Sequence, residues 1–259
     1  MKIRHKLLFC TISYTFIVII TYYANKDVVD IGSKNLLNIY LYFHLYNKFG
    51  GQFTITDLLF SILPTMITAS IFANSIAIDI EKNATYIFTR TEKRSFWLLK
   101  KACRVGINLL GITVLFYFIQ FIFYSFMGFV VYDIREFVVK SIYTSMIIFF
   151  SNLAMVLFEN ALIMKWGDLW GYFISISVYC ISMLSVYVVQ VLKSYYYLMP
   201  LMQKYGLVYQ WEEVASYFPL WDSSMSLKVV YFILPIICVA YVLVGFIMAK
   251  KVIQEKEFY

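Results

Sequence analysis

The sequence predicts an all-α membrane protein with six transmembrane helices and with both termini in the cytoplasm. Its 259 residues are 62% hydrophobic and only 14% charged, and its mean hydropathy is +0.74. Soluble domains are about 45–50% apolar and about 25% charged, so a single core cannot bury this many apolar side chains. The composition therefore excludes a soluble enzyme, a disordered chain and a disulfide-stapled secreted module.

Six apolar stretches are long enough to cross a bilayer core of about 30 Å, which takes about 20 helical residues. The expected spans are residues 7–23, 58–78, 105–127, 141–164, 169–192 and 229–249. The first follows Lys2, Arg4 and Lys6, as the apolar core of a secretory signal peptide would. The run is long, however, and the Tyr22-Tyr23-Ala24-Asn25 that follows it lacks a small residue three before the possible cut, which favours a retained span.

The positions of the cations predict the orientation. Most of the 22 Lys and Arg residues lie at the N-terminus, between spans two and three, and at the C-terminus. The cations in the other connections are balanced by carboxylates. Because cytoplasmic loops carry the excess of Lys and Arg, both termini are expected on the cytoplasmic side. The net charge of +7 is therefore expected at the cytoplasmic face of the membrane. Its expected partner there is membrane lipid, and no nucleic acid is expected to bind.

Two outer connections are rich in aromatic residues. Residues 36–49 are apolar but too short to cross, so they predict an interfacial or re-entrant helix. Residues 193–228 carry Tyr195-Tyr196-Tyr197, Trp211 and Trp221 and are interrupted by Pro200 and Pro219. Since Tyr and Trp prefer the membrane interface, short helices in the outer leaflet are favoured over a solvated loop.

The cytoplasmic connection 79–101 is the most informative segment. Ala84, Ile87 and Phe88 follow one another at i, i+3 and i+4, which places them on one face of a short amphipathic helix. A basic cluster that includes Arg94 follows it. The cations of this cluster, taken alone, would be explained by their effect on the orientation of the protein in the membrane and by attraction to anionic lipid headgroups. The helix before them favours a docking element for a partner.

Residues 50–101 resemble the type-2 ABC transporter permeases of bacteria. The resemblance is carried by Gly50-Gly51-Gln52-Phe53, Asp57-Leu58-Leu59-Phe60-Ser61-Ile62-Leu63-Pro64, Asp79-Ile80-Glu81, Tyr86-Ile87-Phe88-Thr89-Arg90 and Arg94. It is strongest to the small permeases of antimicrobial-peptide export or immunity. It implies a type-2 ABC exporter-like fold, with residues 1–259 forming one transmembrane domain in the bacterial cell membrane.

The resemblance also implies partners and a coupling site. Such permeases form homo- or heterodimers and receive force from a separate ABC ATPase, which binds ATP and Mg²⁺. The implied ATPase-coupling residues are Glu81, Ala84, Ile87, Phe88, Arg90 and Arg94. Ala84-Thr85 departs from the Gly-Thr of many members.

No Walker A motif is present in this chain. Gly106 and Gly111 have its mutual spacing, but Ile112-Thr113 follows where Lys and Ser or Thr are required. We therefore expect this chain to hold no cofactor and to be no enzyme.

Within the spans, Glu159 is the notable ionisable residue. With Asn160 and Asn152, it forms either part of a translocation path or a polar contact between helices, and the alternative is that it reaches the interface near Lys165. Pro64 and Pro235 are candidate hinges. Small residues in span five, including Gly171 and Ser175, predict close helix packing.

The leading function is thus the membrane subunit of an ATP-driven exporter of a hydrophobic or amphipathic substrate such as a peptide, a lipid or an antibiotic. A channel or secondary transporter without an ATPase is the alternative, although the spans hold few ionisable groups and no evident repeat of broken helices. An intramembrane enzyme is a weaker alternative. Glu212-Glu213 invite comparison with the paired glutamates of membrane proteases, but those acids work within the bilayer, whereas this pair is expected in an outer loop.

Overall fold

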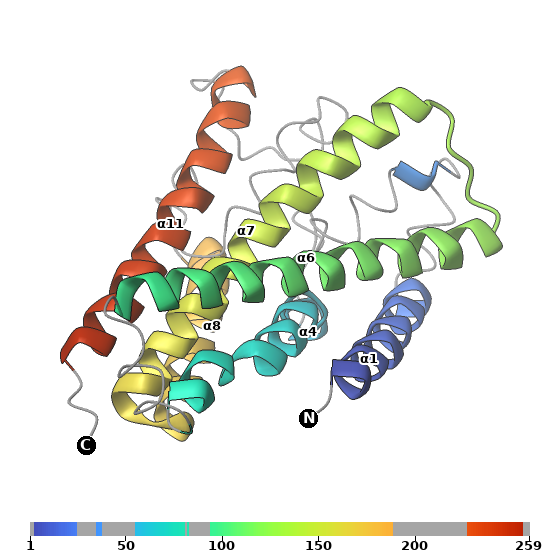
Figure 1. The fold of residues 1–259 in the computed structure, drawn as a ribbon. Helices are drawn as coiled ribbons and strands as arrows, with labels where there is room; N and C mark the ends of the chain where they lie inside the picture. Colours follow the sequence, from blue (N-terminus) through green and yellow to red (C-terminus); the bar gives the residue numbers. More distant parts are fainter. Residues whose placement is uncertain are drawn as a thin grey trace.

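The computed structural model describes residues 3–24, 35–37, 55–80, 82, 94–188 and 227–255, which are almost entirely helical (Figure 1). Within these ranges there is no β-strand, and one isolated bridge joins Asn35 to Val130. The helices are α1 (Ile3–Ala24), α4 (Ile55–Phe72), α6 (Arg94–Phe126), α7 (Ile134–Trp166), α8 (Asp168–Val188) and α11 (Leu227–Glu255). The expected all-α class is therefore confirmed for the part of the chain that is described.

Within the described residues, four segments are long and apolar enough to cross a membrane. They are Leu63–Ile80, Arg94–Phe126, Ile134–Trp166 and Pro235–Glu255, and they correspond to the second, third, fourth and sixth expected spans. The first expected span coincides with a shorter apolar stretch, Leu8–Tyr23 in α1, and the fifth coincides with α8. These helices are typical of a membrane protein, while the total of six spans and their orientation stay predictions.

α7 lies at the centre of the bundle. α11 packs along it, α8 folds back against it, and α6 joins it through a short turn (Figure 1). One apolar cluster joins α1 to α6 through residues such as Tyr14, Val18 and Phe116. A second joins α7 to the ends of α6 and α11 through residues such as Leu98 and Ile253.

Glycine makes the sharp turn between α7 and α8 possible. Gly167, at φ 85°, is the only residue between the two helices, and its N–H donates to the Ile163 carbonyl over 2.8 Å. An L side chain rarely adopts that backbone conformation. Four residues later, a Cβ at Gly171 would lie 2.5 Å from Ile163 Cγ1. The predicted close packing of span five is thus present at Gly171.

The expected hinge prolines lie inside helices. α4 includes Pro64 and α11 includes Pro235. The second span is interrupted elsewhere, because α4 ends at Phe72, Ala73 and Asn74 form a turn, and a further helical segment covers residues 75–80. The local sequence gives no Pro or Gly at this break, so its cause lies in another part of the chain.

Many apolar side chains on the outside of the bundle are exposed. On α6 they include Ile107, Val114, Phe118 and Phe126, each more than half exposed. A surface this apolar is unfavourable in water and suits lipid or a second protein chain. The exposed face therefore agrees with the composition.

Candidate functional site

Asn160 bridges the break in the second span. In a continuous helix the Ile76 N–H would donate to the Phe72 carbonyl. Here the Asn160 Oδ1 accepts from the Ile76 N–H over 3.0 Å, and Asn160 Nδ2 donates to the Phe72 carbonyl over 3.0 Å. Nδ2 also donates to the Val156 carbonyl of its own helix over 2.8 Å. One buried amide from α7 thus replaces one backbone hydrogen bond of the second span and satisfies both of its partners.

The preceding residue, Glu159, is buried with little polar support. Its side chain is 1% exposed. The Ser175 hydroxyl lies 3.5 Å from Oε1, but the same hydroxyl is 2.9 Å from the Tyr172 carbonyl. A hydroxyl has one proton to donate, so the shorter bond takes it. Glu159 Oε2 has no hydrogen-bond partner among the described residues.

Glu159 also lacks a cation to pair with in the described part of the chain, where the ion pairs join other residues. An ionisable side chain at the middle of a membrane helix costs about 2.5–3.5 kcal/mol on insertion scales. The carboxyl is buried among the described helices, and which of the two sequence interpretations holds stays a prediction. Asn152 is also buried in α7, two turns earlier, and no hydrogen bond joins it to Glu159 or Asn160.

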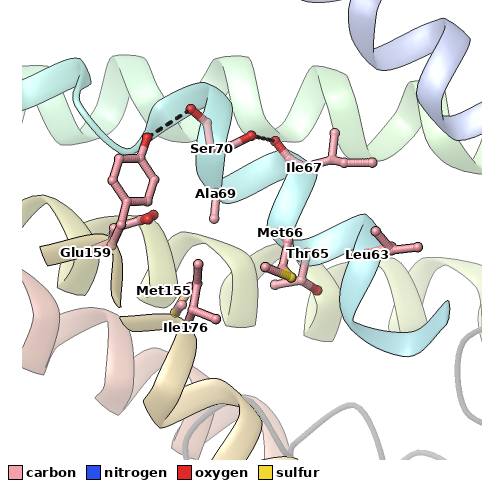
Figure 2. A pocket seen from close by; sticks show the side chains of 10 residues that line it. Leu63, Thr65, Met66, Ile67, Ala69, Ser70, Met155, Glu159 and Ile176 are labelled. Carbon is pink, nitrogen blue, oxygen red and sulfur yellow. Dashed lines mark hydrogen bonds between the residues drawn. The ribbon is translucent and has the colours of Figure 1, made fainter. Parts of the chain in front are cut away.

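A cavity of about 320 Å³ lies beside Glu159 (Figure 2). It is formed where α4 and α8 both pack on α7 while making few contacts with each other. Its walls are mostly apolar. The lining residues are Leu63, Thr65, Met66, Ile67, Ala69 and Ser70 of α4, Met155 and Glu159 of α7, and Tyr172 and Ile176 of α8.

A polar contact joins α8 to α4 beside this cavity. The Tyr172 hydroxyl reaches across from α8 and donates to the Ser70 carbonyl of α4 over 3.5 Å, which is a long hydrogen bond. Figure 2 shows Ala69 and Met66 of α4 facing Met155 and Ile176 across the space. The result is an apolar cavity with a single carboxylate in its wall.

The implied coupling residues are only partly within the described structure. Glu81, Ala84, Ile87, Phe88 and Arg90 lie outside the described residues. Outer residues 38–49 and 193–226, which include Glu212-Glu213, lie outside them as well.

The two helix ends on either side of the expected coupling residues are held in place by charged groups. Before it, Asp79 forms an ion pair with Lys101 of α6. After it, Arg94 Nη1 donates to the Ile253 carbonyl over 3.3 Å. Ile253 is in the last turn of α11, where carbonyls lack helical partners, so Arg94 supplies one. These contacts connect residues 75–80, α6 and α11 at one end of the bundle.

A second, more open hollow of about 580 Å³ lies beside Arg94, between the start of α6 and the end of α11. Arg94 and Lys250 both line it, together with Phe96, Leu99 and Phe246. Two cations beside exposed aromatic and aliphatic groups suit contact with an acidic, partly apolar partner.

Sequence reasoning missed the break at Ala73-Asn74 and its link to Asn160. The available signal was Asn160 itself, since an amide inside a span is usually hydrogen-bonded to another helix. The position of the Ser175 hydroxyl beside Glu159 was also missed, because the spacing of Ser175 with other small residues predicted packing alone. Comparison with known protein families, with curated proteins and with solved structures gave no match to this chain.

Proposed function

We propose that this protein is the membrane-spanning permease subunit of an ATP-driven ABC transporter whose ATPase is a separate chain. The observation that carries the proposal is that contacts hold together the two helix ends between which the expected coupling residues lie, namely the end of residues 75–80 and the start of α6 at Arg94. The Asp79–Lys101 ion pair joins the end of the second span to α6, and Arg94 joins the start of α6 to α11. A push on the segment between them therefore reaches three helices at once.

The force has a route into the membrane domain. From Asp79 it passes along residues 75–80 to the turn at Ala73-Asn74, which Asn160 of α7 holds. A helix break bridged by a side chain resists rotation less than a continuous helix does. In the proposed mechanism, closure of the ATPase pair moves the coupling segment, and the second span turns at this break relative to α7.

A second permease subunit completes the transporter in this proposal, either as a second copy or as a related chain. Its apolar interface would cover part of the exposed α6 face. The cargo is hydrophobic or amphipathic, such as a peptide, a lipid or an antibiotic, and the location is the bacterial cell membrane. Export and producer immunity are the processes that the sequence resemblance favours.

The test is coupled ATP turnover. The chain, with an affinity tag, is co-expressed with a Walker-motif ATPase encoded beside it, and the purified pair is assayed in nanodiscs. We expect co-purification and ATP hydrolysis. Glu81→Lys and Arg90→Glu should each reduce the hydrolysis at least tenfold while leaving membrane insertion intact.

Glu255→Lys is the matched control, because Glu255 is an exposed carboxylate at the end of α11 whose ion-pair partner among the described residues is Lys251 of its own helix, over 3.7 Å. It should keep the turnover of the unchanged protein, since a surface pair of this kind contributes about 1 kcal/mol or less. Transport by the purified chain without any ATPase would overturn the proposal.

A further inference from the structure

The buried carboxylate of Glu159 has an open hydrogen-bonding site that faces no group of the described chain. Its Oε2 has no partner, and the weak Ser175 contact is made by Oε1. A buried polar atom without a partner costs about 1–3 kcal/mol, and more if it carries charge. A ligand that donates to Oε2 would remove this cost.

The cavity beside Glu159 defines what kind of ligand fits. About 320 Å³ is at the small end of ligand sites, which range over about 300–1,000 Å³. Met66, Met155 and Ile176 line it with flexible or branched apolar groups, and methionine adapts to varied shapes. The space therefore suits a short alkyl group, and its single charged group suits a cation.

We propose that this cavity binds an amphiphilic amine, with its ammonium group at Glu159 and its alkyl chain between α4 and α8. The ammonium would donate to Oε2 as a charge-assisted hydrogen bond, which is about twice as strong as a neutral one. The alkyl chain would leave water or lipid headgroups for the apolar wall. Whether the amine is also the transported cargo rests on the proposed transport function, whereas its binding does not.

Other ligand classes fit less well. A metal ion requires several ligands, and the described residues hold no group of three His, Cys, Asp or Glu side chains. A fatty acid would place a second carboxylate against Glu159. A neutral alcohol can occupy the apolar space but donates one uncharged hydrogen bond.

The first experiment compares ligands on the unchanged protein. Purified chain in phosphatidylcholine nanodiscs is dialysed to equilibrium against radiolabelled decylamine, decanol or decanoate, and uptake by empty nanodiscs is subtracted. We expect saturable decylamine binding that is at least about tenfold tighter than decanol binding, and no decanoate binding. Equal affinity for decylamine and decanol would overturn the proposal, and so would the absence of saturable binding.

The second experiment compares variants. Glu159→Gln should lower decylamine affinity about tenfold or more and leave decanol affinity unchanged. Glu136→Gln, at an exposed carboxylate in the first turn of the same helix, should change neither. Ile176→Trp should weaken both ligands, because the larger side chain fills the cavity.

Each variant is first checked for a single elution peak and a cooperative thermal transition. If Glu159→Gln fails this check, the comparison of head groups and the Ile176→Trp result decide the proposal. If the unchanged protein associates with an ATPase but binds no amine, the site is rejected and the proposed transporter stands. If the unchanged protein binds the amine but associates with no ATPase, the site stands and the proposed transporter is rejected.

Discussion

At the scale of single residues, Asn160 has the most specific structural role. Its amide accepts from one backbone group of the second span and donates to another, so both the oxygen and the nitrogen are assigned by their partners. A hydrophobic residue of similar size would leave the Ile76 N–H and the Phe72 carbonyl unpaired in an apolar surrounding. The side chain therefore determines the geometry of a neighbouring helix.

Replacing Asn160 should destabilise the protein through the second span. Asn160→Ala is expected to lower the free energy of unfolding by about 1–3 kcal/mol, since interhelical hydrogen bonds in membranes are worth about 0.6–1.7 kcal/mol each. Asn160→Asp keeps the acceptor but loses the donor to the Phe72 carbonyl, so it should also destabilise. Denaturant unfolding in detergent micelles, followed by circular dichroism, measures both.

Asn152→Ala is the control for these variants, because Asn152 is a buried amide on the same helix with no hydrogen bond to the break. It should cost clearly less stability than Asn160→Ala. Equal losses for the two variants would contradict the bridging role.

At the scale of helices, the α7–α8 hairpin is the most tightly constrained element. Gly167 turns the chain in one residue, and Gly171 then lies so close to Ile163 that a Cβ would come within 2.6 Å of the Ile163 backbone nitrogen. A backbone contact cannot be relieved by a rotamer change. The two helices would have to separate, and Ser175 would then move away from Glu159.

Gly171→Ala should therefore destabilise the hairpin by about 1–3 kcal/mol, which is the usual cost of overpacking. Gly111→Ala is the matched control in α6, because nothing lies within 4 Å of the position of its Cβ. It should be neutral or slightly stabilising, since alanine favours a helix more than glycine does. Thermal unfolding of both variants in the same detergent tests this, and a loss of stability in Gly111→Ala alone would contradict it.

At the scale of the whole molecule, two sets of helix ends lie at opposite ends of the bundle. The turn at Gly128–Asp133 lies at one end of the bundle, while the ends of residues 75–80 and of α11 meet the start of α6 at the other (Figure 1). The orientation inferred from the cations then assigns the second end to the cytoplasm.

Labelling with a membrane-impermeant maleimide tests this orientation. In a background where Cys10, Cys103, Cys180 and Cys238 are replaced by serine or alanine, Tyr132→Cys should react in intact cells, since Tyr132 is 69% exposed. Lys251→Cys, at an exposed residue near the end of α11, should react only after the cells are permeabilised. The reverse pattern would invert the topology, and reaction of both in intact cells would reject the membrane assignment.

The sequence by itself determined the class of the protein. An apolar excess in stretches of about 20 residues leaves few structures other than membrane helices, because every backbone group in lipid must be paired within its own helix. The same local rule predicted where the described helices lie, although α6 begins at Arg94 and α7 at Ile134, well before the expected starts at residues 105 and 141. It also singled out Glu159 and Asn160 as polar groups that need partners.

Only the tertiary structure decided what those partners are. Asn160 closes a break 84 residues away at Ile76, Glu159 borders a cavity made by three helices, and Arg94 caps a helix 159 residues further along. No local pattern encodes these pairings, because each depends on which helix faces which after packing. The prolines show the same limit, since Pro64 and Pro235 lie within their helices while the break falls where a neighbouring amide can satisfy it.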